Sequence, residues 1–220
     1  VVGDTGMMTI VGEWVLRSAC TQICCWRAEG MAPLRVSVNV SSVQFQNSGF
    51  VAMVQRVLRE TGAPPGLIEL ELTESLLMAN VDQARTTIDA LKALGLRISI
   101  DDFGTGYSSL NYLRQFAVDY LKIDRSFVID IAGNPRDRAV VVAIIELAKA
   151  LDITVVAEGV ETEAQAAFFS DAQCDELQGF FFCRPLPVAQ LERHLAAAFK
   201  AGGVYRASAW NSVPGLLQTI

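Results

Sequence analysis

The sequence has a single histidine, His194, among its 220 residues. A Ser-His-Asp triad or a histidine-based zinc site needs this residue next to other reactive groups, and His194 lies alone in a segment with helical spacing. No C-x-x-C pair occurs among the five cysteines, which are Cys20, Cys24, Cys25, Cys174 and Cys183. We therefore exclude histidine-based hydrolysis and zinc binding. We interpret the cysteines as small buried apolar residues in a reducing cytosol, and His194 as a helix-surface residue.

Clusters of basic residues, long apolar runs and glycine-rich nucleotide loops are also absent. The net charge is −6 and no basic stretch alternates with aromatic residues, which argues against a nucleic-acid polymer as partner. No apolar stretch approaches the roughly 20 residues of a membrane-spanning helix, and no signal peptide is recognisable. A cytoplasmic location is therefore expected for this chain, and any membrane anchor of the full-length protein would lie upstream. The glycine-rich turn of a dinucleotide-binding fold is missing as well.

Strand-like and helix-like segments alternate along the chain. Alternation of apolar and polar residues predicts strands at 36–41, 68–73, 98–100, 120–124, 153–158 and 178–182. Helical spacing predicts helices at 8–28, 51–60, 82–94, 109–116, 136–151, 161–170 and 187–200. This order is typical of a parallel α/β architecture. No linker or repeat interrupts it, so residues 1–200 are predicted to form one domain, followed by a tail at 201–220 with no assigned structure.

The predicted strands carry polar residues on one parity, near their C-terminal ends. These residues are Asn39, Glu71, Asp101, Lys122, Asp124 and Glu158. An open sheet would scatter them, whereas a closed barrel brings the C-terminal ends of all its strands to one mouth. The predicted fold class is therefore a TIM-type (β/α)8 barrel. It is incomplete at its N-terminus, because six strands are predicted where about eight are needed.

The centre of the predicted site is the segment ISIDDFGTGYSSL, residues 98–110. Two adjacent carboxylates, Asp101 and Asp102, follow a strand, and they repel each other unless positive charge lies between them. A divalent cation is the simplest such charge, and carboxylate and amide oxygens suit Mg²⁺ or Mn²⁺. Two alternatives need no metal. They are a solvated Asp-Asp turn with a glycine hinge, and a buried layer of salt bridges inside the barrel.

Six motifs in register give the chain a resemblance to a known family. They are VNVSSVQF, ELTES, DDFGTGYSSLNYL, DYLKIDRSF, VVAEGVET and QGFFFCRPLP. In this order and spacing, from about residue 11 to residue 195, the chain resembles the EAL family. These are bacterial signal-transduction phosphodiesterases that open cyclic di-GMP to the linear dinucleotide pGpG. The resemblance implies the EAL barrel fold and hydrolysis by a two-metal mechanism.

The resemblance also implies a role for each motif residue. The implied ligands of two Mg²⁺ or Mn²⁺ ions are Asn39, Glu71, Asp101, Asp102 and Glu158. Lys122 would position the attacking water, with Glu158 and Asp102 as the other catalytic residues. Substrate binding would fall to Asp124, Glu161, Gln178 and Pro185. Glu74 would anchor the DDFGTGYSS loop.

One family feature is missing, and it leaves alternatives open. The Glu-Ala-Leu motif of an early strand is absent, and residues 1–14 resemble the stretch that follows it. We therefore expect these 220 residues alone to hydrolyse cyclic di-GMP poorly. One alternative is a catalytically inactive receptor that binds cyclic di-GMP. Another is a scaffold that forms a homodimer through the loop and helix after Asp102, with Tyr107, Leu110 and Tyr112 as its apolar surface. Fusion to upstream sensor or GGDEF-type domains is common in the family.

Overall fold

The computed structural model describes residues 2–105 and 113–200, which fall into two compact units, one up to Tyr120 and one from Leu121 onward. The dimer surface predicted at Tyr107, Leu110 and Tyr112 lies outside the described residues. So do the tail at 201–220 and half of the helix predicted at 109–116. No helix of the described part has the length and apolar character needed to cross a membrane. The single domain predicted for residues 1–200 stays a prediction.

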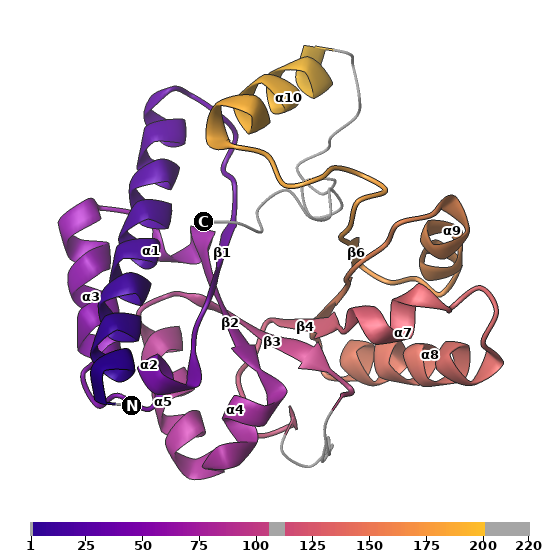
Figure 1. The fold of residues 1–220 in the computed structure, drawn as a ribbon, viewed down its shortest axis with the longest axis horizontal. Coiled ribbons are helices and arrows are strands. Elements are labelled where there is room, and N and C mark those ends of the chain that lie inside the picture. Colours follow the sequence, from indigo (N-terminus) through magenta and orange to yellow (C-terminus); the bar gives the residue numbers. More distant parts are fainter. Residues whose placement is uncertain (1, 106–112, 201–220) are drawn as a thin grey trace. The chain divides into compact units, whose positions relative to one another are not determined.

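The first unit contains three parallel strands that lie side by side in chain order (Figure 1). They are β1 (Val36–Asn39), β2 (Ile68–Thr73) and β3 (Arg97–Phe103). Residues of both parities are buried in β2. Ile68, Leu70 and Leu72 lie on one parity, and Glu69 and Glu71 on the other. Burial of both faces is usual for a parallel strand, but here one face is lined by carboxylates.

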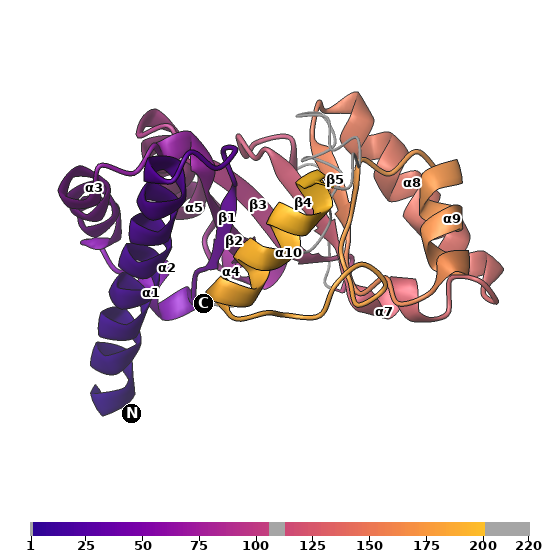
Figure 2. The same cartoon turned by 90° about the horizontal axis from the view of Figure 1, so that it is seen from above.

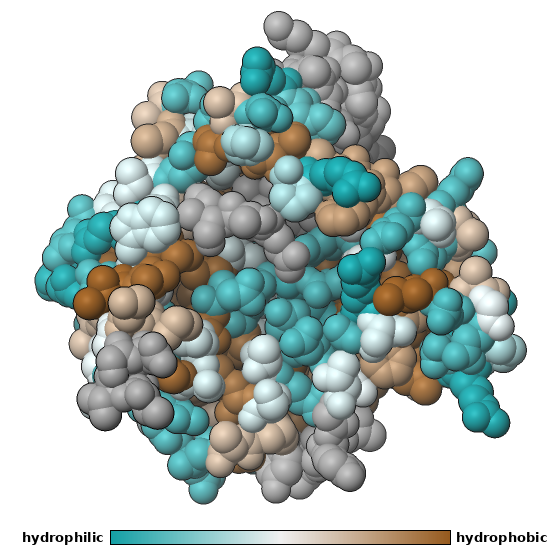
Figure 3. Space-filling model, viewed as in Figure 1, coloured by the Kyte–Doolittle hydropathy of each residue, from teal (hydrophilic) through white to brown (hydrophobic). Residues whose placement is uncertain are grey.

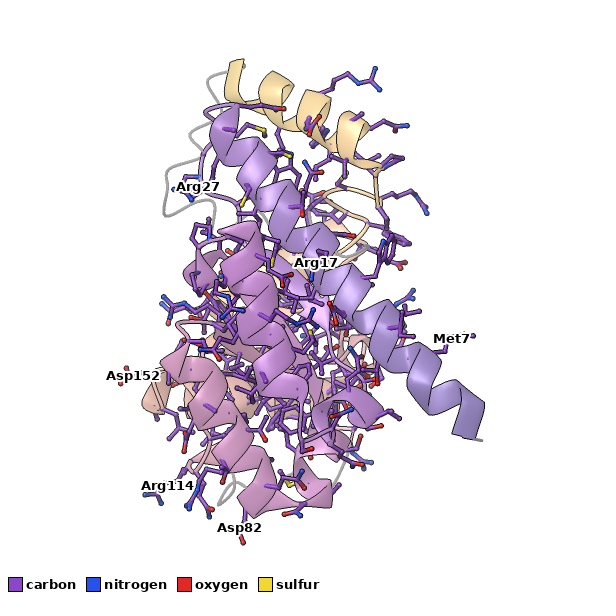
Figure 4. All side chains as sticks on the ribbon, turned by 90° about the vertical axis from the view of Figure 1, so that its left-hand side faces the viewer. Met7, Arg17, Arg27, Asp82, Arg114 and Asp152 are labelled. Atoms are coloured by element: carbon purple, nitrogen blue, oxygen red, sulfur yellow. The ribbon has the colours of Figure 1, made fainter. Side chains whose placement is uncertain are left out.

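In the described part of this unit, three long helices and three short ones accompany these strands. The long helices are α1 (Val2–Ala28), α3 (Phe50–Thr61) and α5 (Val81–Ala93), and the short ones are α2 (Ser42–Phe45), η1 (Pro65–Leu67) and α4 (Glu74–Ala79). Helices α1 and α3 run side by side (Figures 2 and 4). Arg17, labelled in Figure 4, forms a 2.7 Å ion pair with Glu60 of α3. Leu16, Cys20 and Ile23 of α1 are buried.

The N-terminal part of α1 is exposed and apolar. Met7, Ile10, Val11 and Trp14 follow one another at helical spacing and are 46–73% exposed. Hydrophobic residues gather on the surface over this helix (Figure 3). The side chain of Met7, labelled in Figure 4, extends away from the rest of the first unit. The buried residues of α1 thus lie in its second half. Among the described residues, its first half makes contacts through Gly12 and Glu13 and also presents an exposed apolar stripe.

The second unit holds strands β4 (Tyr120–Ile123, from Leu121), β5 (Thr154–Ala157) and β6 (Glu176–Leu177), again in chain order. Its helices are α7 (Arg125–Ile129), α8 (Pro135–Ala150), α9 (Glu163–Asp171) and α10 (Val188–Lys200). Helix α7 packs against α8 (Figure 2). Strand and helix thus alternate in both units, as the sequence predicts.

The structure differs from the sequence-based predictions at the last strand and at the cysteines, and agrees with them at His194. The strand predicted at 178–182 is wrong, because β6 is Glu176–Leu177 and a turn follows it. The turn packs closely on another segment, since a Cβ on Gly179 would lie 2.1 Å from the carbonyl oxygen of Val160. Cys20 is buried but Cys25 is exposed, so the prediction that all five cysteines are buried is also wrong. His194 is exposed on α10, as predicted.

Candidate functional site

Three predicted ligands lie on neighbouring strands of the first unit. In the backbone register, Asn39 of β1 is opposite Glu71 of β2, and Thr73 of β2 is opposite Asp101 of β3. Paired residues of parallel strands point to the same face, so Asn39, Glu71 and Asp101 share one face near the C-terminal ends. Glu71 is 2% and Asp101 9% exposed, whereas Asn39 is exposed. The alternating sequence thus brings one amide and two buried carboxylates together.

The segment after Asp101 leaves the regular strand geometry. Asp102 has a left-handed backbone with φ 55° and is exposed, and its amide donates a 3.0 Å hydrogen bond to the Asp101 carboxylate. The amide of Gly104 donates a 3.2 Å hydrogen bond to Oε2 of Glu74, which is 5% exposed. This is the contact that a loop anchor at Glu74 would make.

The chemistry of these donors suits a hard divalent cation, because all are carboxylate or amide oxygens. Within residues 2–105 and 113–200, however, no group of three or more His, Cys, Asp or Glu side chains is arranged to hold a metal ion. Glu71 and Asp101 are the carboxylates of the shared strand face, and Asn39 adds an amide. The ligand set therefore stays a prediction, supported by donor chemistry and strand register.

A buried ion pair forms the core of the site in the second unit. Lys122 of β4 is 2% exposed, and its Nζ lies 2.5 Å from Oε1 of Glu158. The amide of Glu158 also donates a 3.2 Å hydrogen bond to the carbonyl of Ile123. A buried ammonium requires such a partner, because desolvating an unpaired charge is costly. The pair places the predicted water-positioning cation next to the predicted carboxylate.

A pocket of about 200 Å³ opens beside this ion pair. Four predicted residues line it, namely Glu158, Glu161, Gln178 and Pro185. The other lining residues are Arg125, Gly159, Gly179, Phe180 and Cys183. The main chain of Gln178 is tied to the Glu158 loop, since its amide donates to Ala157 O at 2.8 Å and its carbonyl accepts from Val160 N at 2.9 Å. The pocket thus brings together predicted residues that are separated by up to 27 positions in the sequence, from Glu158 to Pro185.

Asp124 and Arg125 behave differently from the sequence-based expectation. The Asp124 carboxylate caps α7 by accepting a 2.9 Å hydrogen bond from the Ser126 amide, and Asp124 is not among the pocket residues. Its role in substrate binding stays a prediction. Arg125 was not predicted, yet it lines the pocket and its Nη2 lies 2.6 Å from Oε1 of Glu161. A cation directly after the LKID motif was the available signal.

The sequence profile of the EAL domain family matches residues 1–185. The chain belongs to the EAL domain family. NbdA of Pseudomonas aeruginosa, named a cyclic di-GMP phosphodiesterase, is 45% identical over 192 residues, which are 87% of this chain and 24% of NbdA. The chain spans about a quarter of the length of the curated relatives it matches.

Solved EAL structures confirm the predicted fold class. The PaMucR phosphodiesterase in complex with c-di-GMP matches with a TM-score of 0.83 and 44% identity, over 86% of this chain and 76% of the PaMucR chain. The EAL domain of Mycobacterium smegmatis DcpA matches with a TM-score of 0.80 and 43% identity, over 84% of each chain. This chain therefore has the fold of the EAL domains that it matches.

Proposed function

We propose that this EAL chain is the catalytic domain of a cyclic di-GMP phosphodiesterase that produces linear pGpG. The observation that carries the proposal is the pocket in the second unit. It brings together Glu158, Glu161, Gln178 and Pro185, which come from two separate family motifs, next to the buried Lys122. The names of NbdA and PaMucR support this substrate and reaction.

Catalysis by this chain would depend on two divalent ions, Mg²⁺ or Mn²⁺. The proposed ligands are Asn39, Glu71, Asp101 and Asp102 in the first unit, and Glu158 in the second. When bound, such ions stabilise the negative charge that develops on the phosphoryl group and lower the pKa of a bound water. A neutral amide at Asn39 keeps the donor set less anionic toward a phosphodiester.

The remaining residues are proposed to bind and orient. Lys122 would position and polarise the attacking water, because Glu158 holds its ammonium in place. A protonated lysine has no lone pair with which to bind a metal ion, so Lys122 is not proposed as a ligand. Glu161, Gln178 and Pro185 would contact the substrate, together with Asp124. Arg125 joins this set because it is the cationic residue of the pocket and the substrate is anionic. Glu74 would hold the loop after Asp102 through the Gly104 amide.

One competing function and three further properties belong beside this proposal. A receptor that binds cyclic di-GMP without hydrolysing it would use the same pocket, so it remains the competing function. The curated relative MucR is named a bifunctional diguanylate cyclase/cyclic di-GMP phosphodiesterase. Fusion of this chain to a GGDEF-type or sensor domain, homodimer formation and a cytoplasmic location are proposed on the same family grounds.

The test measures binding and turnover on the same protein preparation. Calorimetry with cyclic di-GMP reports binding, and chromatography of pGpG released with Mg²⁺ or Mn²⁺, before and after EDTA, reports hydrolysis. Metal-dependent release of pGpG supports the phosphodiesterase. Binding with no release in either metal supports the receptor when a longer chain that includes a Glu-Ala-Leu strand also releases no pGpG, since these 220 residues lack that motif and are expected to hydrolyse cyclic di-GMP poorly. A protein that does not bind cyclic di-GMP overturns both functions.

A further inference from the structure

Gln165 is a buried polar residue that no motif role explains. It lies in the first turn of α9, is 6% exposed, and forms four side-chain hydrogen bonds. Its Oε1 accepts from the amides of Glu161 (2.7 Å) and Thr162 (2.9 Å). Its Nε2 donates to the carbonyls of Val128 (3.0 Å) and Ile129 (3.1 Å). The amide therefore uses both donors and both acceptor positions.

Helix capping accounts for only part of this pattern. In a capping box, Thr162 Oγ1 accepts from the Gln165 amide, and the Gln165 side chain accepts from the Thr162 amide. The bonds to Glu161, Val128 and Ile129 lie outside that motif. Helix α7 has five residues, so the carbonyls at its C-terminal end need partners from outside the helix. Val128 O accepts a 3.3 Å hydrogen bond from the Ile131 amide, and Gln165 adds a second bond to Val128 O and one to Ile129 O.

The two segments that Gln165 joins both line the pocket. Helix α7 begins with Arg125, and the loop after β5 carries Glu158, Gly159 and Glu161. The same two segments are also joined at the surface, where Nη2 of Arg125 lies 2.6 Å from Oε1 of Glu161. Gln165 joins them in the interior. The outer contact is solvent-exposed and weak, with side chains 56% and 42% exposed, so it cannot hold the two segments by itself. The buried amide is the stronger link.

We propose that Gln165 is a positioning residue, which sets the distance between Arg125 and Glu161 and thereby the affinity of the pocket for its ligand. It touches no ligand itself and acts through the backbone of residues 128–129 and 161–162. The proposal rests on the proposed function only for the identity of the ligand, cyclic di-GMP.

The experiment compares Gln165→Met with Thr162→Ala. The first variant keeps the approximate size of the side chain and removes all four hydrogen bonds. The second removes the hydroxyl of the same capping box and leaves the bridge intact. We expect Gln165→Met to weaken cyclic di-GMP binding about tenfold, as outer-shell partners of binding sites do, and Thr162→Ala to change it less than twofold at equal folded fraction. Equal losses in the two variants, or none in Gln165→Met, would overturn the positioning role.

Two safeguards keep the test decisive. If Gln165→Met does not fold, Gln165→Glu replaces it, because it keeps an acceptor for the two amides and places a second carboxylate oxygen against two carbonyls. Crystal structures of parent and variant report the distance from Arg125 Nη2 to Glu161 Oε1, and an unchanged distance overturns the proposal. If the parent protein does not bind cyclic di-GMP, the proposed function fails while this distance still decides the role of Gln165.

Discussion

Lys122 and Glu158 form a 2.5 Å ion pair in which the lysine side chain is 2% and the glutamate side chain 14% exposed. The pair connects the C-terminal half of β4 to the first residue after β5. Because a buried charge is costly without an opposite charge beside it, we expect the stability of the fold to depend on this contact. A purely catalytic lysine and a purely structural one can be separated by experiment.

The first prediction concerns Lys122→Met. Loss of the cation next to Glu158 should lower the free energy of unfolding by about 3 kcal/mol. In a Glu158→Gln background the same change should cost at least about 1 kcal/mol less, since the two residues are coupled. Urea denaturation of the four proteins measures this, with Lys149→Met, which removes an exposed pair with Glu146, as the control. Strictly additive effects would show that the pair adds no coupling energy.

Asp101→Asn tests the predicted metal ligand. In a complete domain that includes the Glu-Ala-Leu strand, we expect Asp101→Asn to abolish pGpG release. We also expect it to decrease Mg²⁺ or Mn²⁺ affinity by more than about 100-fold, because the loss of a metal ligand costs more than the loss of a residue that only hydrogen-bonds to a ligand. Metal titration by calorimetry measures it, beside Asp89→Asn on the exposed side of α5. Metal affinity within a few-fold of the parent would remove Asp101 from the ligand set.

Gly159→Ala tests the position of Arg125. Gly159 has φ +73°, and a Cβ there would lie 2.4 Å from Cγ of Arg125. The left-handed backbone should cost roughly 1–2 kcal/mol, and the methyl group should push Arg125 out of the pocket and weaken cyclic di-GMP binding. Gly62→Ala is the matched control, because Gly62 also has a left-handed backbone, with φ +70°, and no atom lies within 4 Å of its Cβ. A folded Gly159→Ala protein with parental affinity would contradict a binding role for Arg125.

Asp119 should make stability depend on pH in the acid range. Burial alone would raise the pKa of Asp119, but hydrogen bonds from Lys92, the Ile98 amide and Arg97 outweigh it and hold that pKa below the ordinary value of an aspartate. A lowered folded-state pKa stabilises the protein above the unfolded-state value, and this stabilisation is lost as the pH falls through the folded-state pKa.

The measurement compares the parent with Asp119→Asn across pH. Near neutral pH the variant should be less stable by about 2 kcal/mol, since it loses charge-assisted hydrogen bonds. Below the ordinary carboxyl pKa of roughly 3.9 the two unfolding curves should converge. A stability difference that stays constant down to acid pH would show that the charge of Asp119 contributes nothing.

Thiol reactivity should separate the cysteines. Burial raises the pKa of Cys20 to about 11 and that of Cys174 to about 12, whereas Cys25 is exposed. Because the thiolate is the reactive form, iodoacetamide near neutral pH should modify Cys25 first and leave Cys20 and Cys174 intact until the protein unfolds. Peptide mass spectrometry over time measures the order, and early labelling of Cys174 would contradict it.

Strands could be predicted where apolar and polar residues alternate, because this pattern shows which side chains of the strand face the apolar core. Ile68–Thr73 was predicted without error, because Ile68, Leu70 and Leu72 alternate with Glu69 and Glu71. The QGFFF run was misread, because three adjacent phenylalanines favour a strand in propensity, while the close approach of Gly179 to Val160 is a tertiary feature. Local patterns cannot show such contacts.

The same limit applies to the site. Family motifs predicted four pocket residues. Arg125 stands in the DYLKIDRSF motif, but its place in the pocket could not be predicted, because its partner Glu161 lies 36 residues away in the sequence. The helix α7 was also missed. Its N-cap, Asp124, continues the polar parity of β4 and therefore looked like a site residue rather than the start of a five-residue helix.

The alternation within β2 has a consequence for how the chain can change in evolution. Inserting or deleting one residue between Ile68 and Leu72 would exchange the faces of all the side chains that follow it. Carboxylates would then enter an apolar layer, and leucines would replace them in the row shared with Asn39 and Asp101. Changes of length should therefore accumulate in turns such as the one at Gly133, while the strand keeps its length even when single side chains vary.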